Sequence, residues 1–388
     1  MDTVQPDTLS GPGFSEGKTS NAMKSKEYEN MARKRMLSFD MVRVVAMAMV
    51  VMIHVSAYMV TYFRGTDNAA FIVGNIFNAL GRAGTPMFMM LTSALLLDER
   101  RETASRAFYR KNLLSIVLLL LFWLLFYAVW RAVLIPLMQG GPIDMEVFVD
   151  NLLLRKGRGL HLWYLYMLVG AYVVIPVLRL FVKKENREYI LGLIVLSAIV
   201  QFGTQTAGVL TQGMRFTVSD FVSKFHMEYA TGYVPYLLIG WYLTAFPPTG
   251  KARIALILSG LAALIWIILS VHFFVGDIPK IRDYMAEMNT LPAMLYGTGL
   301  FTWITTRCGE RENRSRVLSV LSQQSFGIYV LHLFLLEILI GAVLPYKAFN
   351  ERLPLVYTLV QFFLIFGLSF LLSLGLSKIK GVRKLVRG

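Results

Sequence analysis

Ten runs of mostly apolar residues dominate this sequence and limit what it can fold into. A helix that crosses a bilayer needs about 20 such residues, and each run is close to that length. Apolar residues make up 56% of the 388 residues and charged residues only 16%, whereas soluble domains carry about 25% charged residues. The sequence therefore excludes an ordinary soluble enzyme and predicts an all-α integral membrane protein with about ten transmembrane helices. The predicted spans are 39–62, 76–97, 112–135, 160–181, 189–209, 230–246, 252–275, 290–306, 322–345 and 354–377.

Basic residues are distributed unevenly between the two sides of these spans. The chain has 39 Lys and Arg against 24 Asp and Glu, a formal net charge of +15. The two tails and the loops on their side of the membrane hold 26 of the 39 basic residues, and the loops on the opposite side hold 11. The remaining two, Arg43 and Arg131, lie within spans. By the positive-inside rule, we expect both termini in the cytoplasm. The charge excess thus indicates topology and attraction to anionic membrane lipids, and no nucleic-acid partner is expected.

The loops between the predicted spans are too short to fold independently, so any chemistry is expected in the membrane domain. We expect a disordered cytoplasmic tail over 1–37, a membrane domain over 38–378 and a basic cytoplasmic tail over 379–388. The start of the sequence lacks the pattern of a cleaved signal peptide, so the first span is expected to serve as the insertion signal. The lone Cys308 permits no intrachain disulfide.

Several common functional motifs do not occur in the sequence. It contains no G-x-x-x-x-G-K-[ST] phosphate loop, no H-E-x-x-H and no C-x-x-C. An ATP-driven pump and a zinc protease are therefore disfavoured, and we expect neither a metal site nor a bound cofactor.

The first span carries three ionisable residues, Asp40, Arg43 and His54. His54 is eleven positions after Arg43, which places both on one helix face about 16 Å apart along the axis. Arg43 is then expected near the cytoplasmic interface and His54 in the outer half of the bilayer. Arg43 could instead be a snorkelling residue, and His54 could simply hydrogen-bond a neighbouring helix. An imidazole is nevertheless well suited to take a proton from a hydroxyl, because its usual pKa lies near operating pH.

Further polar residues lie in later spans, where ionisable groups are costly and are functional candidates. His161 opens the fourth span, and His332 lies near the middle of the ninth. Ser325, Tyr329 and His332 share one helix stripe by their spacing, with Glu337 one to two turns further out. Taken alone, His161 and His332 fit a structural hydrogen-bonding role better than a catalytic one.

Four motifs in order resemble those of the acyltransferase 3 family of integral membrane acyltransferases. The first is Arg43, ten residues and then His54. The second, Arg82-Ala-Gly-Thr-Pro-Met-Phe-Met-Met-Leu-Thr-Ser-Ala94, is similar to the family's second-span block. The third is His161-Leu-Trp-Tyr-Leu165, and the fourth is Ser325-Phe-Gly-Ile-Tyr-Val-Leu-His332. The resemblance spans nearly the whole predicted membrane domain.

Two departures from the family pattern bear on the predicted site. Ala94 replaces the usual Gly after Ser93, and the third-span entrance Arg106-Ala-Phe-Tyr-Arg110-Lys111 does not keep the common Arg-x-x-Arg spacing. Within this resemblance, Arg106, Arg110 and Lys111 are expected to bind the phosphates of an acyl-CoA donor.

The resemblance implies a function as well as a fold. Its nearest branch comprises surface-polysaccharide O-acetyltransferases of the enterobacterial common antigen type, in the bacterial plasma membrane. It implies that acetyl-CoA or another acyl-CoA is the donor substrate and that a hydroxyl of an envelope glycan or lipid-linked sugar is the acceptor. It further implies that His54 is the catalytic histidine and that Arg43 belongs to the donor site. Supporting or oxyanion-stabilising candidates are Arg82, His161, Tyr329, His332 and Glu337.

Several alternatives stay open at this level. His54 could act as general base or as a transient acyl carrier. A similar membrane domain occurs in vancomycin-resistance serine racemases, which makes a transporter of a small polar substrate such as an amino acid the main rival function. The third option is a structural partner in an envelope assembly, and the architecture also permits a homodimer.

Overall fold

A computed structural model describes residues 35–63, 68–98, 105–153, 161–203, 233–273, 290–342 and 352–387. Within these ranges the chain forms helices and no strands, apart from an isolated bridge between Met36 and Glu312. The all-helical architecture expected from the sequence is thus confirmed for this part of the chain. The predicted tail over 1–37 lies almost wholly outside the described residues.

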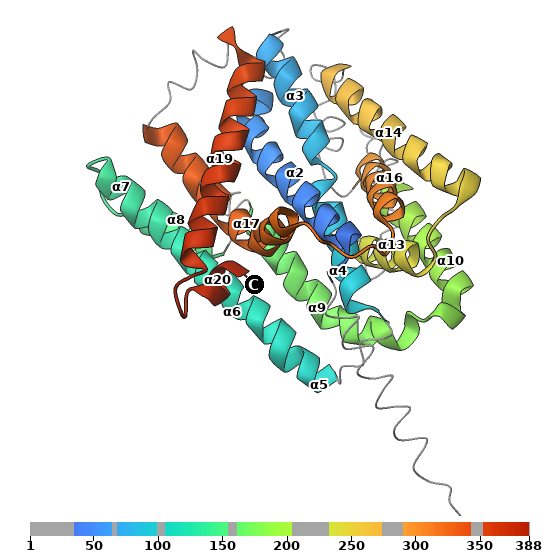
Figure 1. The fold of residues 1–388 in the computed structure, drawn as a ribbon. Helices are drawn as coiled ribbons and strands as arrows, with labels where there is room; N and C mark the ends of the chain where they lie inside the picture. Colours follow the sequence, from blue (N-terminus) through green and yellow to red (C-terminus); the bar gives the residue numbers. More distant parts are fainter. Residues whose placement is uncertain are drawn as a thin grey trace, which may run out of the picture.

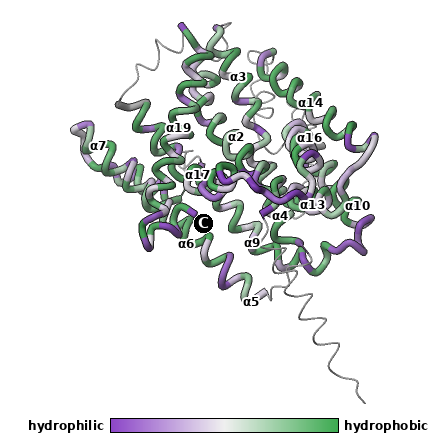
Figure 2. The backbone as a smooth tube through the Cα atoms, in the orientation of Figure 1, coloured by the Kyte–Doolittle hydropathy of each residue, from purple (hydrophilic) through white to green (hydrophobic). Residues whose placement is uncertain are grey.

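Six helical segments are long and apolar enough to cross a membrane. They are Leu37–Tyr62, Ser105–Met138, Trp163–Phe181, Gly250–Phe273, Arg316–Leu339 and Pro354–Leu376. Each corresponds to one of the ten predicted spans, and Figure 2 shows these helices as largely apolar along their lengths. The other four predicted spans contain shorter or less apolar helices among the described residues, and parts of 189–209 and 230–246 lie outside them. The count of ten therefore stays a prediction.

The helices of the bundle have the following bounds. They are α2 (Leu37–Tyr62), α3 (Ala69–Gly81), α4 (Gly84–Leu96), α5 (Ser105–Phe108), α6 (Leu114–Val129), α7 (Ile135–Met138), α8 (Met145–Leu152), α9 (Trp163–Phe181), α10 (Arg187–Ala198), α13 (Val234–Ala245), α14 (Gly250–Phe273), α16 (Leu291–Cys308), α17 (Arg316–Ala342), α19 (Pro354–Leu376) and α20 (Arg383–Arg387). Short π-helical turns, η1 (Tyr109–Leu113) and η2 (Trp130–Leu134), flank α6, a 3-10 turn η4 (Lys184–Asn186) precedes α10, and η5 (Ile199–Gly203) follows it.

Helix α2 runs through the middle of the bundle (Figure 1). It packs against α3, α4, α16, α17 and α19, so residues on several of its faces are covered by protein. Buried α2 residues contribute to three apolar clusters. One is shared with α6, α9 and α17, the second with α4, α13 and α16, and the third with α3 and α14. A polar residue on α2 can therefore face protein rather than lipid.

The predicted second span, 76–97, is in fact two separate helices, which corrects the single continuous span expected from the sequence. Helix α3 ends at Gly81 and α4 begins at Gly84, with Arg82 at the junction. Pro86 in the first turn of α4 has no N–H to donate to the carbonyl of Arg82, so a continuous helix is disfavoured there. Broken helices at membrane depth occur where protein or a cavity surrounds the exposed backbone groups. We therefore looked for a candidate active site beside this break between α3 and α4.

Candidate active site

A pocket lies where α2, the α3/α4 junction, the start of α9 and α17 meet. Its volume is about 140 Å³, close to that of a cavity that takes up a benzene molecule. Its walls are mainly apolar and aromatic, with a few polar groups. The lining residues are Val50, Ile53, His54, Gly81, Thr85, Phe88, His161, Trp163, Tyr164, Leu168, Ser325, Phe326 and Tyr329.

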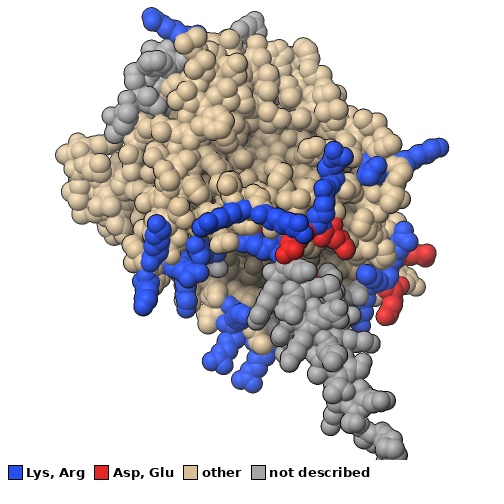
Figure 3. Space-filling view, viewed as in Figure 1, with Lys and Arg blue, Asp and Glu red and all other residues tan. Residues whose placement is uncertain are grey.

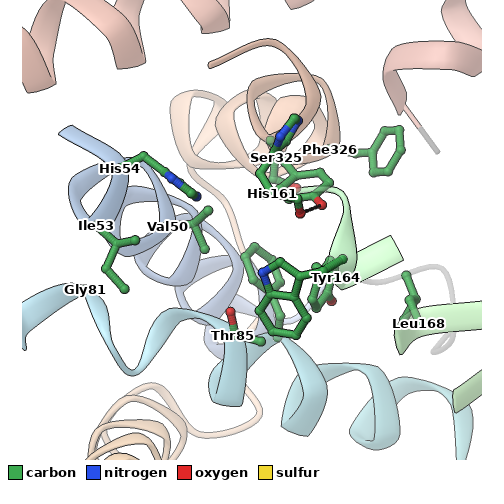
Figure 4. Close-up of a pocket in the computed structure, with 13 residues that line it drawn as sticks. Val50, Ile53, His54, Gly81, Thr85, His161, Tyr164, Leu168, Ser325 and Phe326 are labelled. Carbon is green, nitrogen blue, oxygen red and sulfur yellow. Dashed lines mark hydrogen bonds between the residues drawn. The ribbon is translucent and has the colours of Figure 1, made fainter. Parts of the chain in front are cut away.

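Residues from all four resemblance motifs line this pocket directly. Figure 4 shows His54 reaching from α2 toward the side of the pocket where His161 and Ser325 lie. The His54 ring is half-buried and makes no hydrogen bond with the described residues. Its centroid lies 5.1 Å from that of His332, and the rings of His161 and His332 are 5.7 Å apart. The fold thus brings together three histidines from distant parts of the sequence.

The hydrogen bonds of His332 fix which of its nitrogens carries the proton. Its Nδ1 lies 2.6 Å from the carbonyl oxygen of Tyr329 and 3.2 Å from that of Ile328. Carbonyl oxygens only accept, so Nδ1 is the donor, and in the neutral ring Nε2 holds a lone pair. The side chain is fully buried and Nε2 has no partner among the described residues. His332 therefore offers an acceptor and no second donor, which argues against an oxyanion-binding role for its neutral form.

His161 sits in the turn just before α9, where both of its ring nitrogens are buried without a partner among the described residues. The Tyr329 hydroxyl donates to the His161 backbone carbonyl over 2.5 Å. The single hydrogen of that hydroxyl is therefore committed. A neutral His161 still has one free N–H and one free lone pair to offer a ligand.

Tyr127 supports α17 from behind the histidines, a residue that the sequence did not single out. Its hydroxyl donates to the Val330 carbonyl over 2.8 Å and accepts from the Phe334 N–H over 3.1 Å. The hydroxyl thus bridges the two ends of the helical turn that contains His332. Its ring also packs edge-on against His161, with centroids 4.5 Å apart. Nothing in the sequence distinguishes Tyr127 from the other aromatic residues of its apolar span.

Arg82 lies at the α3/α4 junction beside the pocket. Its guanidinium donates to the side-chain oxygen of Asn78, one turn earlier. It does not line the pocket itself, although its neighbours Gly81 and Thr85 do. Asn78 in turn donates to the carbonyl of Ile53, the residue before His54.

Arg43 belongs to a polar network at the start of α2. The buried Asp40 accepts hydrogen bonds from Arg35, Ser322 and Asn313, and this network joins α2 to the beginning of α17. The Arg43 guanidinium donates to the Ser322 hydroxyl over 3.0 Å and lies 3.6 Å from the Asp40 carboxylate.

The predicted phosphate-binding residues Arg106, Arg110 and Lys111 lie on α5 and η1, exposed and away from the pocket lining. Phe108 anchors this segment, because it is buried and its ring lies 5.8 Å from that of Tyr172 on α9. Figure 3 shows Lys and Arg side chains gathered over the lower half of the view, where Figure 1 places α5 and α20. The three residues are thus on the same end of the bundle as Arg43.

Glu337 is not among the pocket residues. Its carboxylate pairs with Arg131 at 2.5 Å and accepts from the indole N–H of Trp130 at 2.9 Å. Arg131 also donates to the Asn151 side chain and lies over the Tyr127 ring. This ion pair joins η2 and α8 to α17.

Among the described residues no group of three or more His, Cys, Asp or Glu is arranged to hold a metal ion. The site instead offers an imidazole without a hydrogen-bond partner, a nearby guanidinium and a narrow apolar chamber. These groups suit proton transfer combined with stabilisation of a developing negative charge.

Comparison with known proteins connects this arrangement to a family. A family model described as an acyltransferase domain, Acyl_transf_3, matches residues 36–378, nearly the whole chain. No curated protein and no solved structure matches the chain.

Proposed function

This chain belongs to the Acyl_transf_3 family of acyltransferases, and we propose that it is a membrane-bound O-acyltransferase that moves an acetyl group from acetyl-CoA to a hydroxyl of an envelope glycan or lipid-linked sugar. The observation that carries the proposal is the convergence of His54, His161 and His332 on one pocket beside Arg82. Two of these histidines have buried nitrogens without partners among the described residues. Such groups are rare unless water or a ligand satisfies them.

The proposed donor site extends from the basic end of the bundle to the pocket. The CoA phosphates would bind there through Arg43, Arg106, Arg110 and Lys111, since guanidinium and ammonium groups form strong charge-assisted hydrogen bonds with phosphate. The thioester would then reach His54, about 16 Å further along α2. The exposure of the three α5 and η1 residues supports a surface role of this kind.

In the proposed reaction, His54 takes the proton of the acceptor hydroxyl while the hydroxyl oxygen attacks the thioester carbonyl carbon. The carbonyl oxygen becomes an oxyanion, and its collapse breaks the carbon–sulfur bond. The CoA thiolate leaves and recovers the proton from His54, so no other reactant is needed. The Tyr329 hydrogen is committed to a backbone carbonyl, which leaves an N–H of His161 as the better oxyanion donor, with the charge of Arg82 adding stabilisation from the α3/α4 junction.

The proposed topology has ten spans, with both termini in the cytoplasm of a bacterium and the protein in its plasma membrane. The distribution of basic residues supports this orientation, because it places Arg43 where cytoplasmic CoA is available. The surface-polysaccharide branch and acetyl specificity rest on the four sequence motifs. The family match does not favour the transporter alternative.

The proposal is tested by deleting the gene and comparing the acylation of envelope glycans by mass spectrometry. We expect one class of glycan to lose the mass of one acyl group and to regain it when the wild-type gene is restored. Unchanged glycan masses, together with loss of uptake of a small polar solute, would favour transport instead.

A further inference from the structure

Asn78 is the centre of a hydrogen-bond network between the α3/α4 junction and the turn of α2 that carries His54. Its side chain is 6% exposed. The Nδ2 atom donates to the Ile53 carbonyl and to the Ser56 hydroxyl, each over 3.2 Å, and the Oδ1 atom accepts from Arg82. The Arg82 guanidinium can only donate and the Ile53 carbonyl can only accept. The Asn78 amide therefore has one orientation that satisfies both, with Oδ1 toward Arg82 and Nδ2 toward Ile53.

The junction and α2 pack in close contact around this network. Gly81 has no side chain, and an added Cβ would lie 2.6 Å from Cγ1 of Ile53 and 2.8 Å from the Met49 carbonyl oxygen. Ile53 directly precedes His54 and lines the pocket with it. Asn78 therefore connects the guanidinium of Arg82 to the stretch of α2 backbone that carries His54.

We infer that Asn78 is a positioning residue, which fixes the Arg82 guanidinium relative to His54 so that its charge acts on the reacting end of the pocket. The inference rests on the proposed function, in which Arg82 stabilises the oxyanion. Such stabilisation depends on donors held in place before the reaction, and displacement of a catalytic arrangement by about 1 Å can lower the rate about 100-fold. Asn78 touches no reacting atom and acts only through Arg82 and α2.

Asn75 supplies a matched control on the same helix. It is one turn earlier and 3% exposed, and its Nδ2 donates to the Ile268 carbonyl over 2.9 Å. It thus ties α3 to α14 through the same type of bond, and within the described residues it forms no hydrogen bond with Arg82 or α2. A purely structural role for Asn78 would make the two asparagines equivalent.

The test compares Asn78→Leu with Asn75→Leu in purified protein reconstituted into lipid. We expect both variants to lower the unfolding temperature. Only Asn78→Leu should lower kcat, by about 100-fold, with little change in the KM for acetyl-CoA. Equal effects of the two variants on kcat, per folded molecule, would overturn the inference. If the leucine variants do not fold, the comparison is repeated with Asn78→Asp and Asn75→Asp, which keep the side-chain volume nearly constant. The two aspartate variants still differ, because only a carboxylate at position 78 would neutralise the charge of Arg82.

A double-mutant cycle shows whether Asn78 acts through Arg82. If it does, Asn78→Leu combined with Arg82→Met should be no slower than Arg82→Met alone. Additive losses would contradict the inference. A His54→Ala control separates the two proposals: full activity there overturns the proposed function, whereas an inactive His54→Ala with additive losses overturns the role of Asn78 alone.

Discussion

His54 and His332 differ in what their surroundings allow them to do. The hydrogen bonds from Nδ1 of His332 to two backbone carbonyls fix its tautomer, so that the lone pair is on Nε2. No hydrogen bond from the described residues fixes the tautomer of His54. A lone pair on a fixed ring whose centroid is 5.1 Å away can orient the N–H of His54 through one bridging water. His54 would then present its other nitrogen to the pocket as the base.

We therefore expect His332→Phe to lower kcat on the order of 100-fold with little change in the KM for acetyl-CoA. The control is His272→Phe, because His272 lies at the end of α14, where it stacks on Phe71 outside the pocket. Both variants are assayed with purified protein in lipid. A His332→Phe protein as fast as the His272→Phe control would show that the lone pair has no part in the reaction.

At the scale of helices, sequence patterns predicted the long spans better than the interrupted ones. The 26 residues of α2 form one helix, and the spacing of Arg43 and His54 followed from helix geometry. The break between α3 and α4 was not predicted, because the run over 76–97 is mostly apolar and Arg82 is its one charged residue. Gly81, Gly84 and Pro86 are compatible with a break between two helices. They indicate one only when it is known that a neighbouring helix packs closely at that point.

The ion pair between Arg131 and Glu337 determines how α17 sits against η2, and neither side chain is fully exposed, at 14% and 25%. We expect Glu337→Gln to lower the free energy of unfolding by about 1–3 kcal/mol, measured by thermal unfolding in detergent. Arg131→Met combined with Glu337→Leu should cost less than the sum of the two single changes, since neither charge is then left without its partner. Fully additive losses in the free energy of unfolding would contradict this account. The control is Glu188→Gln, because Glu188 lies on the exposed face of α10.

At the scale of the whole molecule, the site depends on contacts between segments far apart in the sequence. The motifs containing Arg43, His54, His161 and His332 could be identified without a structure. Their convergence on one pocket could not be derived from spacing, because it depends on how α2, α9 and α17 pack. Asn78 and Tyr127 were missed for the same reason, since their roles are defined by carbonyl groups on other helices.

The arrangement also separates the proposed donor-binding residues from the proposed catalytic ones along the length of the bundle. Lys and Arg side chains gather over the lower half of the view in Figure 3, and the histidines line or flank a chamber further along α2. This separation fits a donor with a charged head and a long arm that carries the reactive thioester.

The most direct test is acetyl transfer by purified protein in proteoliposomes, supplied with radiolabelled acetyl-CoA and glycan extracted from the deletion strain. We expect wild-type protein and the His272→Ala control to label the glycan. We expect His54→Ala, at equal amounts of folded protein, to be slower by at least about 100-fold. Full transfer by His54→Ala would contradict the central claim that His54 performs the chemistry.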